Sequence, residues 1–203
     1  MTASLLARLK EELAAFGAAH DAQAPSHGQR LLNITPDTGE FLAVLVRATQ
    51  ARRIVEIGTS NGYSTLWLAE AAQPQGGHVT TLERDPAKLA MARENFARGG
   101  LSAAITAWQG DAGDWLAAAP AASIDLVFLD AQRAAYVDWW PGLDRLLRPG
   151  GLLVVDNAVS HAEEVAGLRA RIDATPGYTV SLVPVGKGEL LAVKPGGAVL
   201  KGS

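Results

Sequence analysis

The stretch VEIGTSNGYST, from Val55 to Thr65, decides the fold of this chain. An apolar run meets an acid, Glu56, and then a turn with two glycines, Gly58 and Gly62, separated by small or polar residues. A short β-branched strand, a glycine turn and a following helix are typical of the first unit of an α/β fold that binds a nucleotide. Because glycine lacks a Cβ atom, a ligand can approach the backbone of the turn closely. We therefore expect a ligand to lie against this turn.

Strand patterns and helix patterns alternate along the rest of the chain. The strand-like runs are RIVEIG, HVTTLE, AAITAWQGD, IDLVFLD and GLLVVDN, and the helical runs are YSTLWLAEAA, PAKLAMARENFARGG, YVDWWPGLDRLL and AEEVAGLRARIDA. Upstream, leucines at helical spacing predict an amphipathic helix, and Pro36 begins a second predicted helix that runs to about Gln50. The segment YTVSLVPVGKGELLAVKP predicts a closing hairpin. This alternation predicts an α/β fold, in which a parallel sheet carries helices on both faces.

The composition is that of a globular protein. The chain has 203 residues, 48% of them hydrophobic and 19% charged, and we expect a single domain over 1–203, with a helical cap or lid in 1–50 and the core in 51–194. It has no cysteine, which excludes disulfides, thiolate metal sites and thiol nucleophiles. A net charge of −3 argues against nucleic acid as a partner. No apolar run reaches roughly 18 residues, so we expect no membrane segment and a cytoplasmic location.

Acidic residues stand at the ends of five consecutive predicted strands. They are Glu56, Glu83, Asp111, Asp130 and Asp156, the last followed by Asn157. In an open α/β sheet, ligands bind at the carboxyl ends of the strands, so these side chains are expected at one functional edge. Glu83 ends the second strand, where a carboxylate accepts hydrogen bonds from the hydroxyls of a ribose. The sequence therefore predicts a nucleoside ligand across the first two strands.

The turn also indicates which nucleoside is bound. A dinucleotide site has the pattern G-x-G-x-x-G, whereas GTSNG lacks the middle glycine, which argues against a nicotinamide dehydrogenase. Glu56 before the turn would repel a phosphate group and would favour a cation. S-adenosylmethionine fits both features, because it carries an adenosine, an ammonium group and a sulfonium but no phosphate. We predict S-adenosylmethionine as the cofactor.

Several motifs in a fixed order resemble one known family. They are VEIGTSNGYSTLWLA, TLERDPAKLAMARENF, GDA, IDLVFLDAQRAAYVDWW, LLRPGGLLVVDN and LVPVGKGELLAVK. Together they resemble the catechol and caffeoyl-coenzyme A O-methyltransferases, from about Asn33 to Lys194. The resemblance implies a Rossmann-like class I methyltransferase fold, with a seven-stranded sheet whose last strand is antiparallel. It implies cofactor contacts from Asn33, Ile34, Thr35, Glu56, Gly58, Ser60, Gly62, Tyr63, Ser64, Glu83, Arg84, Gly110, Asp111, Ala112 and Asp130.

The resemblance also implies a divalent metal ion held by Asp130, Asp156 and Asn157. Two carboxylates and an amide offer hard oxygen ligands, which suit Mg²⁺, Ca²⁺ or Mn²⁺. Such an ion can bind two neighbouring substrate oxygens and lower the pKa of the one that attacks. The alternative is that Asp156 and Asn157 only cap the following loop and that Asp130 contacts the cofactor.

The chain departs from the family pattern near the expected acceptor site. Arg133 stands where a lysine base is usual, and a guanidinium has no lone pair with which to accept a proton. We therefore assign catalysis to Asp130 and Arg133, with Arg133 stabilising a phenolate, and we keep His161 as a candidate proton acceptor or a solvated loop residue. Gln132 replaces a common acid and Lys187 a common aspartate. Both changes favour an acidic substrate.

The predicted function is methyl transfer from S-adenosylmethionine to a hydroxyl of a small aromatic vicinal diol, assisted by a divalent metal. The expected partner is a phenolic or catechol-like small molecule, and a homodimer through the amino-terminal helix is a further hypothesis. Two alternatives remain open. One is a tRNA nucleoside O-methyltransferase, and the other is a non-catalytic protein that binds S-adenosylmethionine. We expect Trp139 and Trp140 to pack on the sheet instead of forming a substrate wall.

Overall fold

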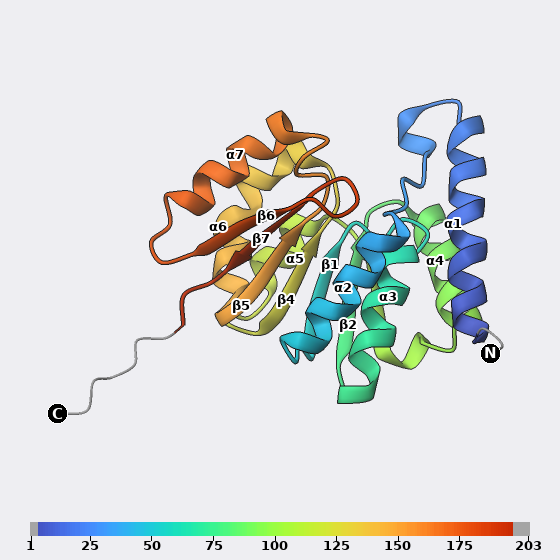
Figure 1. The fold of residues 1–203 in the computed structure, drawn as a ribbon, viewed down its shortest axis with the longest axis horizontal. Coiled ribbons are helices and arrows are strands. Elements are labelled where there is room, and N and C mark those ends of the chain that lie inside the picture. Colours follow the sequence, from blue (N-terminus) through green and yellow to red (C-terminus); the bar gives the residue numbers. More distant parts are fainter. Residues whose placement is uncertain (1–3, 197–203) are drawn as a thin grey trace.

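A computed structural model of the chain describes residues 4–196, apart from the side chain of His27. Its centre is a seven-stranded sheet with the order β3-β2-β1-β4-β5-β7-β6 (Figure 1). The strands are β1 Arg53–Ile57, β2 His78–Glu83, β3 Ile105–Gln109, β4 Ile124–Leu129, β5 Leu147–Val155, β6 Thr179–Val183 and β7 Glu189–Val193. Only β7 runs antiparallel to its neighbours β5 and β6. The predicted α/β fold with an antiparallel last strand is confirmed.

Within residues 4–196, seven α-helices cover the two faces of the sheet (Figure 1). They are α1 Leu5–Gln23, α2 Pro36–Ala48, α3 Tyr63–Ala72, α4 Pro86–Arg98, α5 Ala112–Ala118, α6 Tyr136–Leu146 and α7 Ala162–Asp173. Buried side chains of α1 to α4 form one core with the sheet, and those of α5 to α7 form the other. None of these helices is long and apolar enough to cross a bilayer.

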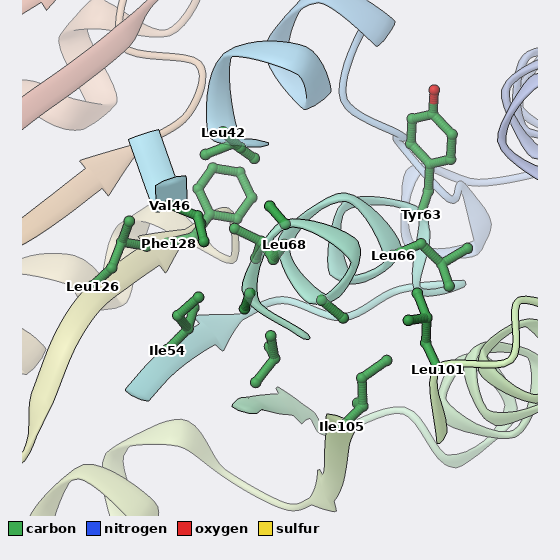
Figure 2. Close-up of a cluster of buried hydrophobic side chains, with 14 of the residues drawn as sticks. Leu42, Val46, Ile54, Tyr63, Leu66, Leu68, Leu101, Ile105, Leu126 and Phe128 are labelled. Carbon is green, nitrogen blue, oxygen red and sulfur yellow. The ribbon is translucent and has the colours of Figure 1, made fainter. Parts of the chain in front are cut away.

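Side chains of the central strands alternate between the two cores. Figure 2 shows Ile54 of β1 and Phe128 of β4 turned towards Leu42 of α2, all of them at most 1% exposed. The intervening residues Val55 and Val127 belong to the opposite core. Strands buried on both faces appear in the sequence as nearly continuous apolar runs, and each such side chain contributes about 1.5–3 kcal/mol. The same alternation turns Glu56 towards the core that contains α3.

Local sequence signals set the ends of several helices. Thr35 caps α2 and accepts a hydrogen bond from the backbone of Thr38, and Pro36 follows as the first helical residue. Asp85 caps α4 in the same way, before Pro86. Side-chain acceptors at these positions satisfy backbone donors that the first turn leaves unpaired. These signals explain why both helices begin at the carboxyl edge of the sheet, where a ligand is expected.

Two elements differ from the sequence prediction. The short helix α5 is not predicted, and it follows the cap residue Asp111, whose side chain accepts a hydrogen bond of 2.8 Å from Gly113 N. Strand β5 begins at Leu147, four residues before the predicted GLLVVDN run. The register against β4 shifts between Ile124 and Leu126, and Gly150 has a φ of 73°. A bulge that continues a strand through Pro-Gly is difficult to predict, because these residues usually end a strand.

Candidate active site

A cavity of about 790 Å³ lies at the carboxyl ends of the central strands. In the sheet β1 lies between β2 and β4, so the strands that follow it along the chain are placed first on one side of β1 and then, from β4 on, on the other. Ligands bind at such a point, where the order of the strands reverses. Most of the predicted site residues line this cavity: Asn33, Ile34, Gly58, Ser60, Tyr63, Ser64, Glu83, Arg84, Gly110, Asp111, Ala112, Asp130, Arg133 and Asn157. Four others, Thr35, Glu56, Gly62 and Asp156, lie outside its lining.

The two glycines of the turn have different roles. Gly58 has a φ of 107°, and a side chain there would collide with the backbone carbonyl of Asp130. Gly62 has a φ of 84° at the start of α3, where a side chain would collide with the ring of Phe96. Both backbones need glycine because of close packing and a left-handed conformation. Gly58 forms part of the cavity wall, whereas Gly62 shapes the entry into α3.

Glu56 lies behind the cavity wall. Its carboxylate is fully buried and accepts hydrogen bonds from Ser64 Oγ at 2.5 Å, from Thr81 Oγ1 at 2.6 Å and from Thr65 Oγ1. Burial raises the pKa of Glu56 to about 7, although the three hydroxyl donors oppose the rise. Its link to the cavity runs through Ser64, which does line it. The cofactor contact predicted for Glu56 stays a prediction, and in the structure Ser64 lies between its carboxylate and the cavity.

Glu83 is held in place at the rim of β2. Its two oxygens accept hydrogen bonds from the backbone N–H groups of Ser60 and Asp85, both at 2.9 Å. A carboxylate oxygen has two lone pairs, so each oxygen keeps the capacity to accept a further hydrogen bond. Glu83 lines the cavity. This arrangement suits the pair of hydroxyls of a ribose.

The segment 28–34 covers this part of the cavity as a strap. The backbone N–H groups of Leu31 and Leu32 donate to the carboxylate of Asp21 at 2.6 and 2.8 Å, and Ser60 Oγ donates to Leu31 O at 2.7 Å. Asn33 Nδ2 donates to Leu13 O at 3.0 Å. Thr35, also a predicted cofactor contact, caps α2. The strap is thus fixed to α1 on one side and to the glycine turn on the other.

Asp130 and Asn157 line the other end of the cavity, and Asp156, outside the lining, is hydrogen-bonded to Asn157. Asn157 Nδ2 donates to Asp130 Oδ1 at 3.1 Å and to Asp156 Oδ2 at 2.9 Å. Burial raises the pKa of Asp130 well above its usual value, and the charge of Asp156 raises it further. The amide nitrogen therefore occupies the position between two carboxylates where a cation would relieve their repulsion. If the amide turns over, its oxygen joins the carboxylate oxygens in one set of hard donors.

The side-chain oxygens of these three residues are of the kind that binds a divalent ion, but three side chains are few for such a site. Within residues 4–196, no group of three or more His, Cys, Asp or Glu side chains is arranged to hold a metal ion. The predicted trio contains two carboxylates and one amide, and Asp156 is only 3% exposed. The metal site predicted from the sequence therefore stays a prediction.

This end is also lined by Glu164, which the sequence analysis missed, and by His161 and Trp139, which it named. Glu164 of α7 lines the cavity and accepts a hydrogen bond of 2.9 Å from Arg133 Nε, so it neutralises part of the charge predicted there. His161 lines the cavity as well, and its Nδ1 lies 2.9 Å from Ser160 Oγ. Trp139 lines the cavity, although we expected it only to pack on the sheet. The pair Arg133–Glu164 spans 31 residues and two elements, so no local pattern could indicate it.

Glu189 is a second missed acid, buried behind Asp156. Its side chain is fully buried and accepts a hydrogen bond of 3.2 Å from Thr38 Oγ1, while Oε2 has no partner among the described residues. Burial raises the pKa of Glu189 to about 10, and the charge of Asp156 adds to this rise. In the sequence Glu189 is only the first residue of a hairpin strand. The acidic end of the site is therefore larger than the strand-end pattern predicts.

Comparison with known proteins places the chain in a family. Residues 11–194 match the family model described as O-methyltransferase. The chain is 40% identical over 149 residues to a catechol O-methyltransferase of Mycobacterium tuberculosis, covering 72% of this chain and 64% of that protein. It is 38% identical over 135 residues to a catechol O-methyltransferase of Niastella koreensis, covering 65% and 61%. The aligned part thus spans less than two thirds of the length of either relative.

A solved structure gives the same result over most of the chain. An O-methyltransferase from Bacillus cereus, in complex with SAH, superposes with a TM-score of 0.78 at 29% identity. The superposition covers 92% of this chain and 90% of that protein. The family model and this likeness both extend over most of the chain. The chain belongs to the O-methyltransferase family.

Proposed function

We propose that the protein transfers a methyl group from S-adenosylmethionine to a hydroxyl of a small aromatic vicinal diol, with the assistance of a divalent metal ion. One observation carries this proposal: a single cavity joins the ribose-type carboxylate Glu83 to the acidic cluster of Asp130 and Asn157. A cofactor held at the first end would direct its reactive methyl group towards an acceptor held at the second. The proposal includes the single domain over 1–203, with a cap or lid in 1–50.

The cofactor end supports S-adenosylmethionine for several reasons. Glu83 offers oxygens to a ribose, and the Gly58 turn exposes backbone beside it. Arg84, Gly110, Asp111 and Ala112 line the adjacent wall, where the adenine would lie. The Bacillus cereus relative is described in complex with SAH, the product form of this cofactor. Ser64, backed by Glu56, would face the methionine part.

The acceptor end would supply the chemistry of the oxygen. The acceptor hydroxyl gives its proton to His161, which lines the cavity, or to water, and an oxygen lone pair forms a bond to the methyl carbon. The carbon–sulfur bond breaks, and its electron pair stays on sulfur as the neutral thioether of S-adenosylhomocysteine. A divalent ion bound by Asp130, Asp156 and Asn157 would lower the pKa of the acceptor hydroxyl. Asp130 and Asn157 would then orient the acceptor, since both line the cavity. Correct placement of two reacting groups contributes strongly to rate.

Replacing Arg133 by Ala should lower kcat by roughly tenfold with a smaller change in KM. Arg133 is positioned by Glu164 and has an exposed side-chain fraction of 17%, so its guanidinium can stabilise negative charge on the acceptor oxygen. The measurement is steady-state methylation of a catechol, and Arg169→Ala, which removes the exposed pair with Asp173, is the matched control. An unchanged kcat in Arg133→Ala would remove this residue from the mechanism.

The proposed function is tested by incubating the protein with labelled S-adenosylmethionine and a panel of catechols, other phenols and tRNA. We expect label on the catechols, strong inhibition by EDTA, and recovery with Mg²⁺, Mn²⁺ or Ca²⁺. Label on tRNA would support the nucleoside alternative, and cofactor binding without any transfer would support the non-catalytic one. Transfer to catechols that EDTA leaves unchanged would contradict the role of the metal. The cytoplasmic location and the homodimer predicted from the sequence stay predictions.

A further inference from the structure

The turn between β6 and β7 is fixed beside the acceptor end of the cavity. The backbone N–H groups of Val159 and Ser160 donate to Lys187 O at 3.2 and 3.0 Å, and Ala158 N donates to Gly188 O at 2.8 Å. On the other side of the turn, Gly186 N donates to the carboxylate of Asp37 at 3.1 Å. The backbone of Lys187 is therefore held both by the loop after Asn157 and by α2.

The side chain of Lys187 is exposed and lines the cavity together with Asp130, Asn157 and His161. Within residues 4–196, the ammonium group of Lys187 forms no hydrogen bond and no ion pair. Since its backbone is held between the loop after Asn157 and α2, the side chain emerges at this end of the cavity. No acid of the described residues neutralises it by contact.

Other cations around the cavity are already engaged or lie elsewhere. Arg133 forms an ion pair with Glu164 at 2.9 Å, so its positive charge is largely balanced. Lys88 donates to Arg30 O at 2.6 Å, beside the strap over the cofactor end. At the acceptor end, Lys187 is the cation of the described chain that keeps an unbalanced charge. A ligand group placed near it would supply the missing anion.

We propose that Lys187 determines acceptor specificity, by binding a carboxylate carried on the ring or on a short side chain of the catechol. The inference rests on the proposed function for the identity of the acceptor. A lysine ammonium and a carboxylate form a charge-assisted hydrogen bond, and the exposed position lets a flexible side chain reach the substrate. One unbalanced cation, with Glu164 and Asp130 nearby, matches a single negative charge better than a dianionic phosphate.

The test compares a carboxylated catechol, 3,4-dihydroxybenzoate, with neutral 1,2-dihydroxybenzene and with cationic 4-(2-aminoethyl)catechol. In Lys187→Met, the ratio of kcat/KM for the carboxylated over the neutral acceptor should fall roughly tenfold. In Lys187→Asp, the preference for the carboxylated over the cationic acceptor should fall roughly a hundredfold. Arg47→Met is the matched control, because Arg47 is an exposed cation in the last turn of α2 that does not line the cavity.

Direct binding separates this inference from the proposed function. Titration calorimetry with protein loaded with S-adenosylhomocysteine gives the Kd of each catechol, and high salt should weaken only the carboxylated one in the native chain. Selective binding that depends on Lys187 without methyl transfer would support the inference and overturn the proposed function. Methyl transfer with an unchanged ratio in both Lys187 variants would overturn the inference and leave the function standing. If the protein neither bound nor methylated any of these catechols, both the inference and the proposed function would be overturned.

Discussion

Asp130→Asn should lower methyl transfer by roughly a thousandfold and yet leave the protein more stable by about 1 kcal/mol. Asparagine keeps the shape and an oxygen that can accept the hydrogen bond from Asn157 Nδ2, so the local structure is preserved. It removes a negative charge that burial and Asp156 make unfavourable. It also removes the carboxylate on which the proposed metal and the acceptor geometry depend. Activity and stability should therefore change in opposite directions.

The measurements are kcat/KM for a catechol and the free energy of unfolding in denaturant, both made on the native chain and the variant. Asp138→Asn is the matched control, because Asp138 is an exposed aspartate on α6 away from the cavity. Full activity in Asp130→Asn would remove Asp130 from the catalytic site. A loss of stability would show that the charge of Asp130 supports the fold instead of straining it.

The fold could be predicted because its signals are local. A β-branched run such as RIVEIG, a glycine turn and a helical pattern each occupy a few residues, and their alternation predicts the parallel sheet. The carboxyl ends of parallel strands meet at one edge, so strand-end acids such as Glu83 and Asp130 could be placed in one site before any coordinates were known. The same reasoning missed α5, whose seven residues carry too few turns for a clear helical pattern.

The details of the site depend on contacts between distant segments. The pair Arg133–Glu164 joins the short 3-10 helix Arg133–Ala135 to α7, and Glu189 meets Thr38 across 151 residues. Sequence spacing carries no information on such pairs, so the ion pair that balances Arg133 could not be predicted from it. Lys187 and Arg133 look alike in the sequence as added cations. In the structure they differ, because Glu164 forms an ion pair with Arg133 and forms none with Lys187.

The position of Glu56 in β1 decides to which face of the sheet its side chain points. It is followed by Ile57, the last residue of β1, and its side chain points towards α3, where Ser64 and Thr65 meet it. On the neighbouring strand, the register places Thr81 directly beside Glu56. The sequence predicts that Glu56 contacts the cofactor, and this stays a prediction. What the structure shows is a buried acid that holds Ser64 and Thr65 in the first turn of α3.

Glu56→Ala should lower the free energy of unfolding by about 3–5 kcal/mol, because it leaves a cavity and three buried hydroxyls without their acceptor.

Glu56→Gln keeps the volume but cannot ionise, so it tests the raised pKa of about 7. An acid with a raised pKa binds more protons in the folded than in the unfolded state, so stability is lost as pH rises from its unfolded value of 4.5 to about 7. Relative to Glu56→Gln, the native chain should lose about 2 kcal/mol between about pH 5.5 and about pH 8. Denaturant unfolding at both pH values measures this difference, with Glu94→Gln on the exposed face of α4 as the control. Parallel curves for the native chain and Glu56→Gln would show that Glu56 stays ionised in the core, with its three hydroxyl donors sufficient to hold the charge.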